Sequence, residues 1–162
     1  LKSPVILSIE SSCDDTCAAI FHEGKIKSNI IHTQLSHTNY GGVVPELASR
    51  EHLAHILPVV KESLVQAEIT LNQVDAIAVT QGPGLLGSLL VGVCFAKSLS
   101  ASLGIPCIGV HHMQAHILSL FAEDPKPTFP FLCLTEKHGM MPWVKHSTKQ
   151  PKCSVSPIPA DH

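Results

Sequence analysis

The sequence lacks three features that would assign it to a common class of protein. It has no excess of positive charge, since 11 Lys and Arg stand against 13 Asp and Glu, so its composition does not indicate a nucleic-acid-binding protein. None of its six cysteines forms a CxxC pair, which leaves a zinc ribbon without support. The most apolar stretch, LLGSLLVGVCFA, is interrupted by Gly and Ser and falls short of the ~20 residues of a membrane span.

Targeting and redox features are equally sparse. The first residues, LKSPVILSIESS, hold one basic residue and a short apolar run, which does not resemble a signal peptide. Four cysteines lie in apolar runs such as VGVCFA, IPCIGV and FLCL, which is typical of buried free thiols in a reducing compartment. We therefore expect a cytoplasmic chain with no membrane segment and with buried, reduced cysteines.

The pattern of apolar residues predicts an α/β fold. Hydrophobic residues make up 44% of the 162 residues, enough for the core of one medium domain. Strands are predicted at residues 5–10, on both sides of a turn at Glu23 and Gly24, at residues 76–79, in PCIGV and in FLCLT. Helices are predicted after Pro45, at residues 87–103 before Gly104, and at residues 112–120. Hairpin strands followed by crossover helices predict a mixed sheet, and this order resembles the ribonuclease-H-like core of sugar kinases, actin and Hsp70.

Two histidines in GVHHMQAHILSL form a candidate pair of metal ligands. His112 and His116 are four residues apart, so a helix places them on one face. Two imidazoles on adjacent turns can bind one borderline ion such as Zn²⁺ or Fe²⁺, but a metal needs more than two ligands. No Glu follows His112, so this is not the HExxH of a metalloprotease. With 11 histidines in the chain, the spacing alone leaves a purely structural role open.

Two polar or glycine-rich loops are candidates for the phosphate side of a nucleotide. In ESSCDDT, Asp14 and Asp15 follow a buried strand, either as a solvated turn or as carboxylates that act through a metal ion or a water. In TQGPGLLGS, glycines permit close approach of the backbone to a ligand before a helix N-terminus, yet the stretch matches neither a Walker A loop nor GxGxxG. We interpret Gly87 and Gly92 as packing positions and leave residues 82–84 open.

The segment YGGVVPELASREH joins a glycine loop to a helix. Its Glu46 and Arg50 are spaced for an i,i+4 pair on a solvated helix face, while YGG could also be a mobile active-site loop.

Five stretches occur in order and carry a resemblance to a known family: IESSCDDT, YGGVVPELASREH, TQGPGLLGSLLVG, AKSLS and VHHMQAH. Together they resemble the bacterial tRNA threonylcarbamoyl-adenosine transferases, a family earlier labelled O-sialoglycoprotein endopeptidases or glycoproteases. The resemblance covers residues 5–135.

The resemblance implies an actin/Hsp70-like fold of two similar lobes, of which this chain holds a truncated first lobe. It implies transfer of a threonylcarbamoyl group from threonylcarbamoyl-adenylate to the adenosine next to the anticodon, in tRNAs reading codons that start with A. It also implies two partners, a catalytically silent paralogue and a small ATPase.

The resemblance further implies a site. A divalent ion, Fe²⁺ or Zn²⁺, would be bound by His112, His116 and an Asp of the second lobe. No residue is assigned as catalytic, and many members have Asp-Glu where this chain has two aspartates. The loops beside substrate and nucleotide would contribute Glu10, Ser11, Asp14, Asp15, Gly82, Pro83 and Gly84.

Residues 136–162 differ in character from residues 1–135. They hold four prolines and no sustained periodicity, whereas family members continue with a segment like V-S-G-G-H-T. Plausible codons for the family segment D-D-A-V-G-E-A-F-D-K, read one base late, encode M-M-P-W-V-K-H-S-T-K, which is residues 140–149 here. We therefore interpret residues 1–135 as an incomplete lobe and residues 136–162 as an out-of-frame, disordered tail.

Three functions follow as hypotheses. As an enzyme fragment, the chain would lack one wall of the cleft, be inactive alone and expose apolar surface meant for the other lobe. As a non-catalytic module, it would bind the silent paralogue through the helix after Pro45 and the helix at residues 87–103. A metal-dependent glycoprotease is disfavoured, because no general base accompanies the histidine pair.

Overall fold

The computed structural model describes residues 3–122, 124–128, 131–135, 143–147 and 156–157. Its main sheet has the strand order β3-β2-β1-β4-β5-β8, antiparallel from β3 to β1 and parallel from β1 to β5. The strands are β1 (Ile6–Glu10), β2 (Asp15–His22), β3 (Lys25–Thr33), β4 (Ala76–Gly82), β5 (Cys107–His111) and β8 (Ser156–Pro157). The helices are α1 (Pro45–Gln66), α2 (Leu86–Leu103) and α3 (His112–Ser119), with short 3-10 turns at Leu35–Tyr40 and Leu71–Gln73. The predicted mixed α/β sheet is confirmed.

Local signals set the ends of these elements. Glu23 and Gly24 have φ of 55° and 74°, the two positive values that a two-residue type I′ hairpin requires between β2 and β3. Pro45 occupies the first turn of α1, and Gly104 ends α2 in the left-handed conformation at φ 66°.

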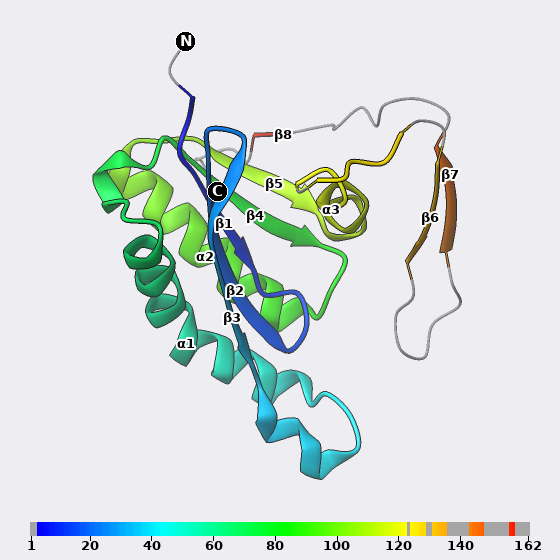
Figure 1. The fold of residues 1–162 in the computed structure, drawn as a ribbon. Coiled ribbons are helices and arrows are strands. Elements are labelled where there is room, and N and C mark those ends of the chain that lie inside the picture. Colours follow the sequence, from blue (N-terminus) through cyan, green and yellow to red (C-terminus); the bar gives the residue numbers. More distant parts are fainter. Residues whose placement is uncertain (1–2, 123, 129–130, 136–142, 148–155, 158–162) are drawn as a thin grey trace.

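The sheet separates two different faces. Residues such as Leu7, Ile9 and Ile77 point to one face and are covered by α1 and α2, so the core lies there. The helices α1 and α2 lie together on one side of the sheet and α3 lies on the other (Figure 1). Because side chains alternate along a strand, Ser8, Glu10, Ala78 and Thr80 face the α3 side.

Two glycines of α2 allow close packing, as the sequence predicted. A Cβ on Gly87 would lie 2.3 Å from Ser49 Oγ of α1, and a Cβ on Gly92 would lie 2.3 Å from Ser11 Oγ in the loop after β1. Both distances are far below van der Waals contact, so the two positions exclude any larger residue without local rearrangement.

Two expectations about α2 were wrong. The helix runs for 18 residues with mean hydropathy 1.6, so by length and composition it is apolar enough to cross a membrane, although Gly and Ser interrupt its sequence. Cys94 was expected to be buried with the other cysteines in apolar runs, but it is exposed, whereas Cys107 and Cys133 are buried as expected. The apolar length was underestimated because the helix continues past Ala96 to Leu103. Cys94 is exposed because α2 packs on β4 and α1 through one narrow face, formed by Ser88, Leu89, Gly92 and Ala96.

The last described strands lie beyond the main sheet or at its edge. β6 (Phe131–Thr135) pairs with β7 (Trp143–Ser147) in a separate two-stranded antiparallel sheet, and β8 pairs with the edge of β5. The sequence predicted β6 but neither β7 nor β8. Most of residues 136–162, the segment interpreted as an out-of-frame tail, lies outside the described residues.

Candidate functional site

The two predicted metal-binding histidines converge at the start of α3. Their Nε2 atoms are 3.1 Å apart, and the rings are perpendicular with centroids 4.5 Å apart. Two nitrogen ligands of a tetrahedral zinc ion, each about 2.0–2.1 Å from the metal, stand about 3.3 Å apart. The two nitrogens therefore fit adjacent positions around one ion of this kind.

The carboxylate of Glu10 fixes the orientation of His112. Glu10 is the last residue of β1, and its Oε2 accepts hydrogen bonds from the Thr80 hydroxyl and from Nδ1 of His112 at 3.3 Å. Burial alone would raise the pKa of Glu10, but hydrogen bonds from His112, Ser12 and Thr80 outweigh it and lower the pKa to about 2. Because Glu10 is ionised, Nδ1 of His112 carries the proton and Nε2 keeps its lone pair for a metal.

This group lines a cavity of about 490 Å³ on the sheet face opposite α1 and α2. Strands β1, β2 and β4 form its floor and α3 forms one wall. Its lining includes Ser8, Glu10, Cys17, Ala19, Asn29, Ala78, Thr80, His112, Ala115, His116 and Ser119.

Buried hydrogen bonds from the helix side hold the loop after β1. His52 of α1 is fully buried, and its ring contacts the Thr16 hydroxyl at 2.7 Å and the Cys13 carbonyl at 3.0 Å. Ser11 donates to the Ser88 carbonyl at 2.9 Å. The loop is thus fixed to α1 and α2 before any ligand binds.

The structure brings only part of the predicted site residues to the cavity. Glu10, His112 and His116 line it, whereas Ser11 is 1% exposed and points toward α2. Asp14 and Asp15 lie at the start of β2 and are not among the lining residues. The buried Oδ1 of Asp15 has no hydrogen-bond partner within the described residues, so a donor from a bound molecule or a water would satisfy it.

The Gly82-Pro83-Gly84 loop also lies outside the lining but contacts the loop after β1. A Cβ on Gly84 would lie 2.5 Å from the Ser12 carbonyl oxygen, and Leu85 N–H donates to that oxygen at 2.8 Å. Gly82 has φ 148°, a conformation that favours glycine. These glycines permit close approach between two loops of the protein itself.

Sequence reasoning missed two residues of the site. Ser12 Oγ lies 3.2 Å from Nδ1 of His112, and Thr80 donates to Glu10. Thr80 could have been found, because β1 and β4 run in parallel with Ile9 opposite Val79, which places Thr80 beside Glu10. No pattern in ESSCDDT distinguishes Ser12 from Ser11.

Within the described residues, the pair His112 and His116 does not belong to a group of three ligands whose donor atoms lie within 4.8 Å of one another. This part of the chain therefore supplies two ligands of a metal site, fewer than a stable site needs.

Comparison with known proteins identifies the sequence family. The family model described as tRNA N6-adenosine threonylcarbamoyltransferase matches residues 25–146. A relative with that name from Christiangramia forsetii is 59% identical over 143 residues, which is 86% of this chain and 42% of the relative. One from Riemerella anatipestifer is 58% identical over 142 residues, again 86% of this chain and 42% of the relative.

A solved structure titled YeaZ from Pseudomonas aeruginosa supports the fold. It superposes with a TM-score of 0.60 at 21% identity and covers 96% of this chain and 65% of that one. The fold is a truncated form of the actin-like, ribonuclease-H-like α/β architecture that the sequence predicted. The chain spans about two fifths of the length of the curated relatives it matches, since the matched share is 42%. At this identity and coverage, the chain belongs to the tRNA N6-adenosine threonylcarbamoyltransferase family.

Proposed function

We propose that the protein to which these residues belong transfers a threonylcarbamoyl group from threonylcarbamoyl-adenylate to the adenosine next to the anticodon of tRNA. This chain would supply the wall of the cleft that carries the histidines. One observation supports it most directly: two imidazole nitrogens 3.1 Å apart, with an ionised carboxylate behind one ring, border a cavity of about 490 Å³.

Each side chain has a defined task in this proposal. His112 and His116 would hold one divalent ion, Fe²⁺ or Zn²⁺, and this ion, when bound, supplies a Lewis acid for the oxygens of the adenylate. Glu10 keeps the proton on Nδ1 of His112, while the backbone N–H of Ser12 and the hydroxyl of Thr80 donate to the Glu10 carboxylate and hold it in place. The remaining ligand and the opposite wall would come from the part of the family protein that this chain does not match.

We propose that this chain alone has no transferase activity, because two protein ligands hold a metal weakly and the adenylate would contact one wall only. In the test, threonylcarbamoyl-adenylate and tRNA are incubated with the chain or with a full-length relative, each with the silent paralogue and the small ATPase. Mass spectrometry then quantifies the modified adenosine. Product from the full-length relative and none from the chain is expected.

Variants of the full-length relative test the site itself. Replacement by Gln at the position of His112 or His116 should lower product formation by roughly 10-fold to 100-fold or more, the range for groups that support a metal. Replacement at the position of His111, which is exposed and adjacent, is the matched control. Equal activity of all three variants would overturn the assignment, and product from the chain alone would overturn its proposed inactivity.

A second function, docking of the silent paralogue, is favoured by an apolar surface on α1 and α2. Leu53, Leu57 and Val65 of α1 are 71%, 48% and 77% exposed, and Leu86 and Leu90 of α2 are 83% and 59% exposed. Leu53 and Leu57 are four residues apart, as are Leu86 and Leu90, so each pair lies on one helix face. Val65 lies about 120° around α1 from Leu53 at ~100° per residue. The two helices pack against each other, so the stripes lie on neighbouring helices of one side of the sheet.

Co-purification with the paralogue tests the docking proposal. The chain should retain the paralogue on an affinity column, and Leu57→Glu with Leu90→Glu should abolish retention, because two charges would be buried at the interface. Ile31→Thr, at an apolar residue of β3 that is 57% exposed, is the control and should retain binding. Retention by the double variant would contradict an interface on these helices.

We also propose that residues 136–162 are translated out of frame. The observation that supports this proposal is that residues 140–149 match the translation of plausible codons for a family segment when those codons are read one base late. Sequencing the DNA across the Thr135 codon and downstream tests it. A coding region for the missing segments in another frame supports the proposal, and its absence overturns it.

A further inference from the structure

A second cluster of metal-binding side chains lies on the opposite face of the sheet from His112 and His116. It consists of His32 on β3 with Glu51 and His55 on α1. One donor atom of each residue lies within 4.8 Å of the other two. Among the described residues, it is the one group of three His, Cys, Asp or Glu with this geometry.

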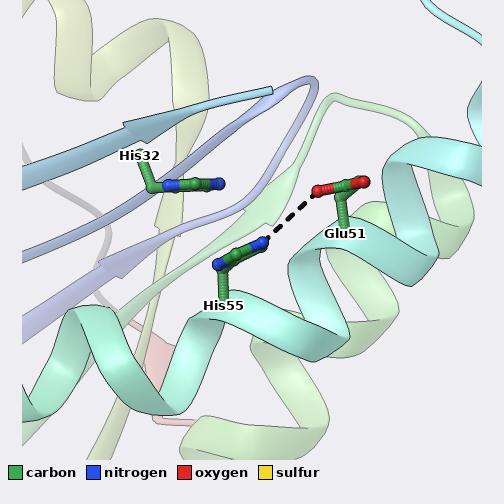
Figure 2. A group of neighbouring side chains, drawn as sticks. All are labelled: His32, Glu51 and His55. Carbon is green, nitrogen blue, oxygen red and sulfur yellow. Dashed lines mark ion pairs between the residues drawn. The ribbon is translucent and has the colours of Figure 1, made fainter. Parts of the chain in front are cut away.

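The fold brings these residues together for simple reasons. Glu51 and His55 are four apart on α1, so they lie one turn apart on the same helix face. His32 pairs in register with Thr16, whose hydroxyl contacts His52 of α1, so His32 also points toward this helix. Figure 2 shows the ring of His32 above that of His55, with the Glu51 carboxylate on the adjacent turn.

The separations resemble those around a bound zinc ion. His55 Nε2 lies 3.4 Å from Glu51 Oε2, and two nitrogen and oxygen ligands of tetrahedral zinc stand about 3.3–3.4 Å apart. The rings of His32 and His55 are stacked, with centroids 3.8 Å apart and an angle of 23° between their planes. Each residue is half-buried, and His55 and Glu51 are 36% and 29% exposed, so the rings can rotate toward a common ion without opening the core.

The cluster also has the donor set that zinc prefers. Two imidazoles and one carboxylate, with a fourth position open to water, are a known set for zinc with three protein ligands. A plain His55–Glu51 ion pair explains only two of the three residues, because it gives no role to the ring of His32.

We propose that His32, Glu51 and His55 form a zinc site that ties the edge strand β3 to α1. β3 is the outer strand of the sheet, and its neighbours are β2 on one side and α1 above it. An ion bound here would join β3 and α1 through residues that are distant in the sequence, since His32 and Glu51 differ by 19 positions. The proposal concerns these three residues only and does not depend on the proposed transferase function.

Metal titration of the full chain tests this site apart from the histidine pair of α3. The parent protein carries His112→Gln and His116→Gln, is stripped with a chelator and is titrated with Zn²⁺ alone by calorimetry. Co²⁺ is used in parallel, because tetrahedral Co²⁺ has a strong visible absorption. One ion per chain and the tetrahedral Co²⁺ spectrum are expected, together with a rise in Tm on adding Zn²⁺.

Single variants in this background decide the ligands. His32→Gln, Glu51→Gln and His55→Gln should each weaken binding by roughly 10-fold to 100-fold or more, because each removes one donor. His22→Gln, at a histidine 3.9 Å from Glu23 that belongs to no three-ligand group among the described residues, is the matched control and should bind as the parent does. Far-UV circular dichroism checks folding, and Glu51→Gln still tests the site if a histidine variant fails to fold. A parent that binds no ion, or variants that bind as it does, would overturn the proposal.

Discussion

The ring of His52 is fully buried, yet both of its nitrogens have partners. Nε2 donates to the Cys13 carbonyl, and Nδ1 accepts from the Thr16 hydroxyl, which is the pattern of a neutral imidazole. Burial lowers the pKa of His52, and the Cys13 carbonyl and the carboxylates of Glu10, Asp14 and Asp15 only partly oppose this. The neutral ring therefore belongs to the folded state and links α1 to the loop beside the candidate site.

The folded state should lose stability in mild acid through His52. In the unfolded chain a histidine has a pKa of about 6.5, so there the ring gains a proton at a higher pH than in the folded protein. The contribution is fully present above that pH and is lost as the pH falls through the lower folded-state pKa. Urea unfolding between pH 8 and pH 5, with His52→Gln beside the wild type, measures it.

The Gln variant should be less stable at pH 8 by about 1–3 kcal/mol, the cost of disturbing a buried hydrogen-bonded group. The difference between the two proteins should shrink toward pH 5. Parallel curves would contradict a neutral His52.

Cysteine reactivity should separate Cys17 from Cys94. Burial, together with the charges of Asp15 and Glu10, raises the pKa of Cys17 to about 12, so at pH 8 only about 1 in 10⁴ of this thiol is ionised. Cys94 is exposed on α2. In labelling with a thiol reagent followed by peptide mass spectrometry, the peptide that holds Cys94 should be modified rapidly and the peptide that holds Cys17 slowly. Rapid labelling of Cys17 in the folded chain would contradict the assigned environment.

The elements themselves were mostly predictable from local pattern. The Glu23-Gly24 turn, Pro45 and Gly104 mark element ends through backbone conformation that few other residues adopt, and all three act as predicted. The exposure of α2 was not predictable, because the sequence of an apolar helix does not show how much of its surface other elements cover. The cluster of His32 with α1 was missed because the Glu23-Gly24 turn sets the β2–β3 register only up to Phe21. An irregularity between Ile20 and Phe21 shifts the pairing by one residue and turns His32, in place of Ile31, toward α1.

The packing of α2 against the loop after β1 requires a residue without a Cβ at position 92, which is Gly92. Gly92→Ala would place a Cβ 2.3 Å from the Oγ of Ser11, which is buried and hydrogen-bonded to the Ser88 carbonyl. Overpacking costs about 1–3 kcal/mol, and the better helix propensity of Ala returns about 1 kcal/mol. We expect a net loss of up to about 2 kcal/mol in the free energy of unfolding.

Two further variants check this packing by thermal or urea unfolding. Gly42→Ala, where a Cβ meets nothing within 4 Å, should change stability by less than about 0.5 kcal/mol. Ser11→Ala with Gly92→Ala should cost less than the sum of the single variants, because the shortest contact is gone. Additive losses would show that Ser11 is not the obstacle.

The molecule as a whole buries one face of its sheet well and leaves its two long helices with apolar outer stripes. The exposed leucines of α1 and α2 lie outside the buried faces of these helices. Exposed apolar side chains on neighbouring helices are typical of a surface that binds a partner. The family relatives are longer than this chain, which matches 42% of their length, so further segments are available in them to cover apolar surface.

Self-association should therefore depend on these stripes. Sedimentation velocity over a range of concentrations should show the wild-type chain shifting to larger species. Leu53→Gln with Leu86→Gln should restore a monomer, because the substitutions remove apolar area from both helices. The control is Ile26→Gln with Ile31→Gln, a double variant on β3 that leaves both helices unchanged. A wild-type chain that stays monomeric throughout would refute this expectation.

The β5 edge of the sheet has a consequence for how the protein aggregates. β8 covers this edge with only two residue pairs, Ile108 with Pro157 and Gly109 with Ser156, and Pro157 has no N–H to donate. A short cover of this kind is easily displaced by a longer strand from a neighbouring molecule. During refolding at high concentration, the exposed β5 edges of different molecules would then pair with strands of neighbouring chains. The resulting aggregates would be richer in β structure than the native protein. Dilution during refolding, rather than a change of temperature, is the condition that would limit this growth.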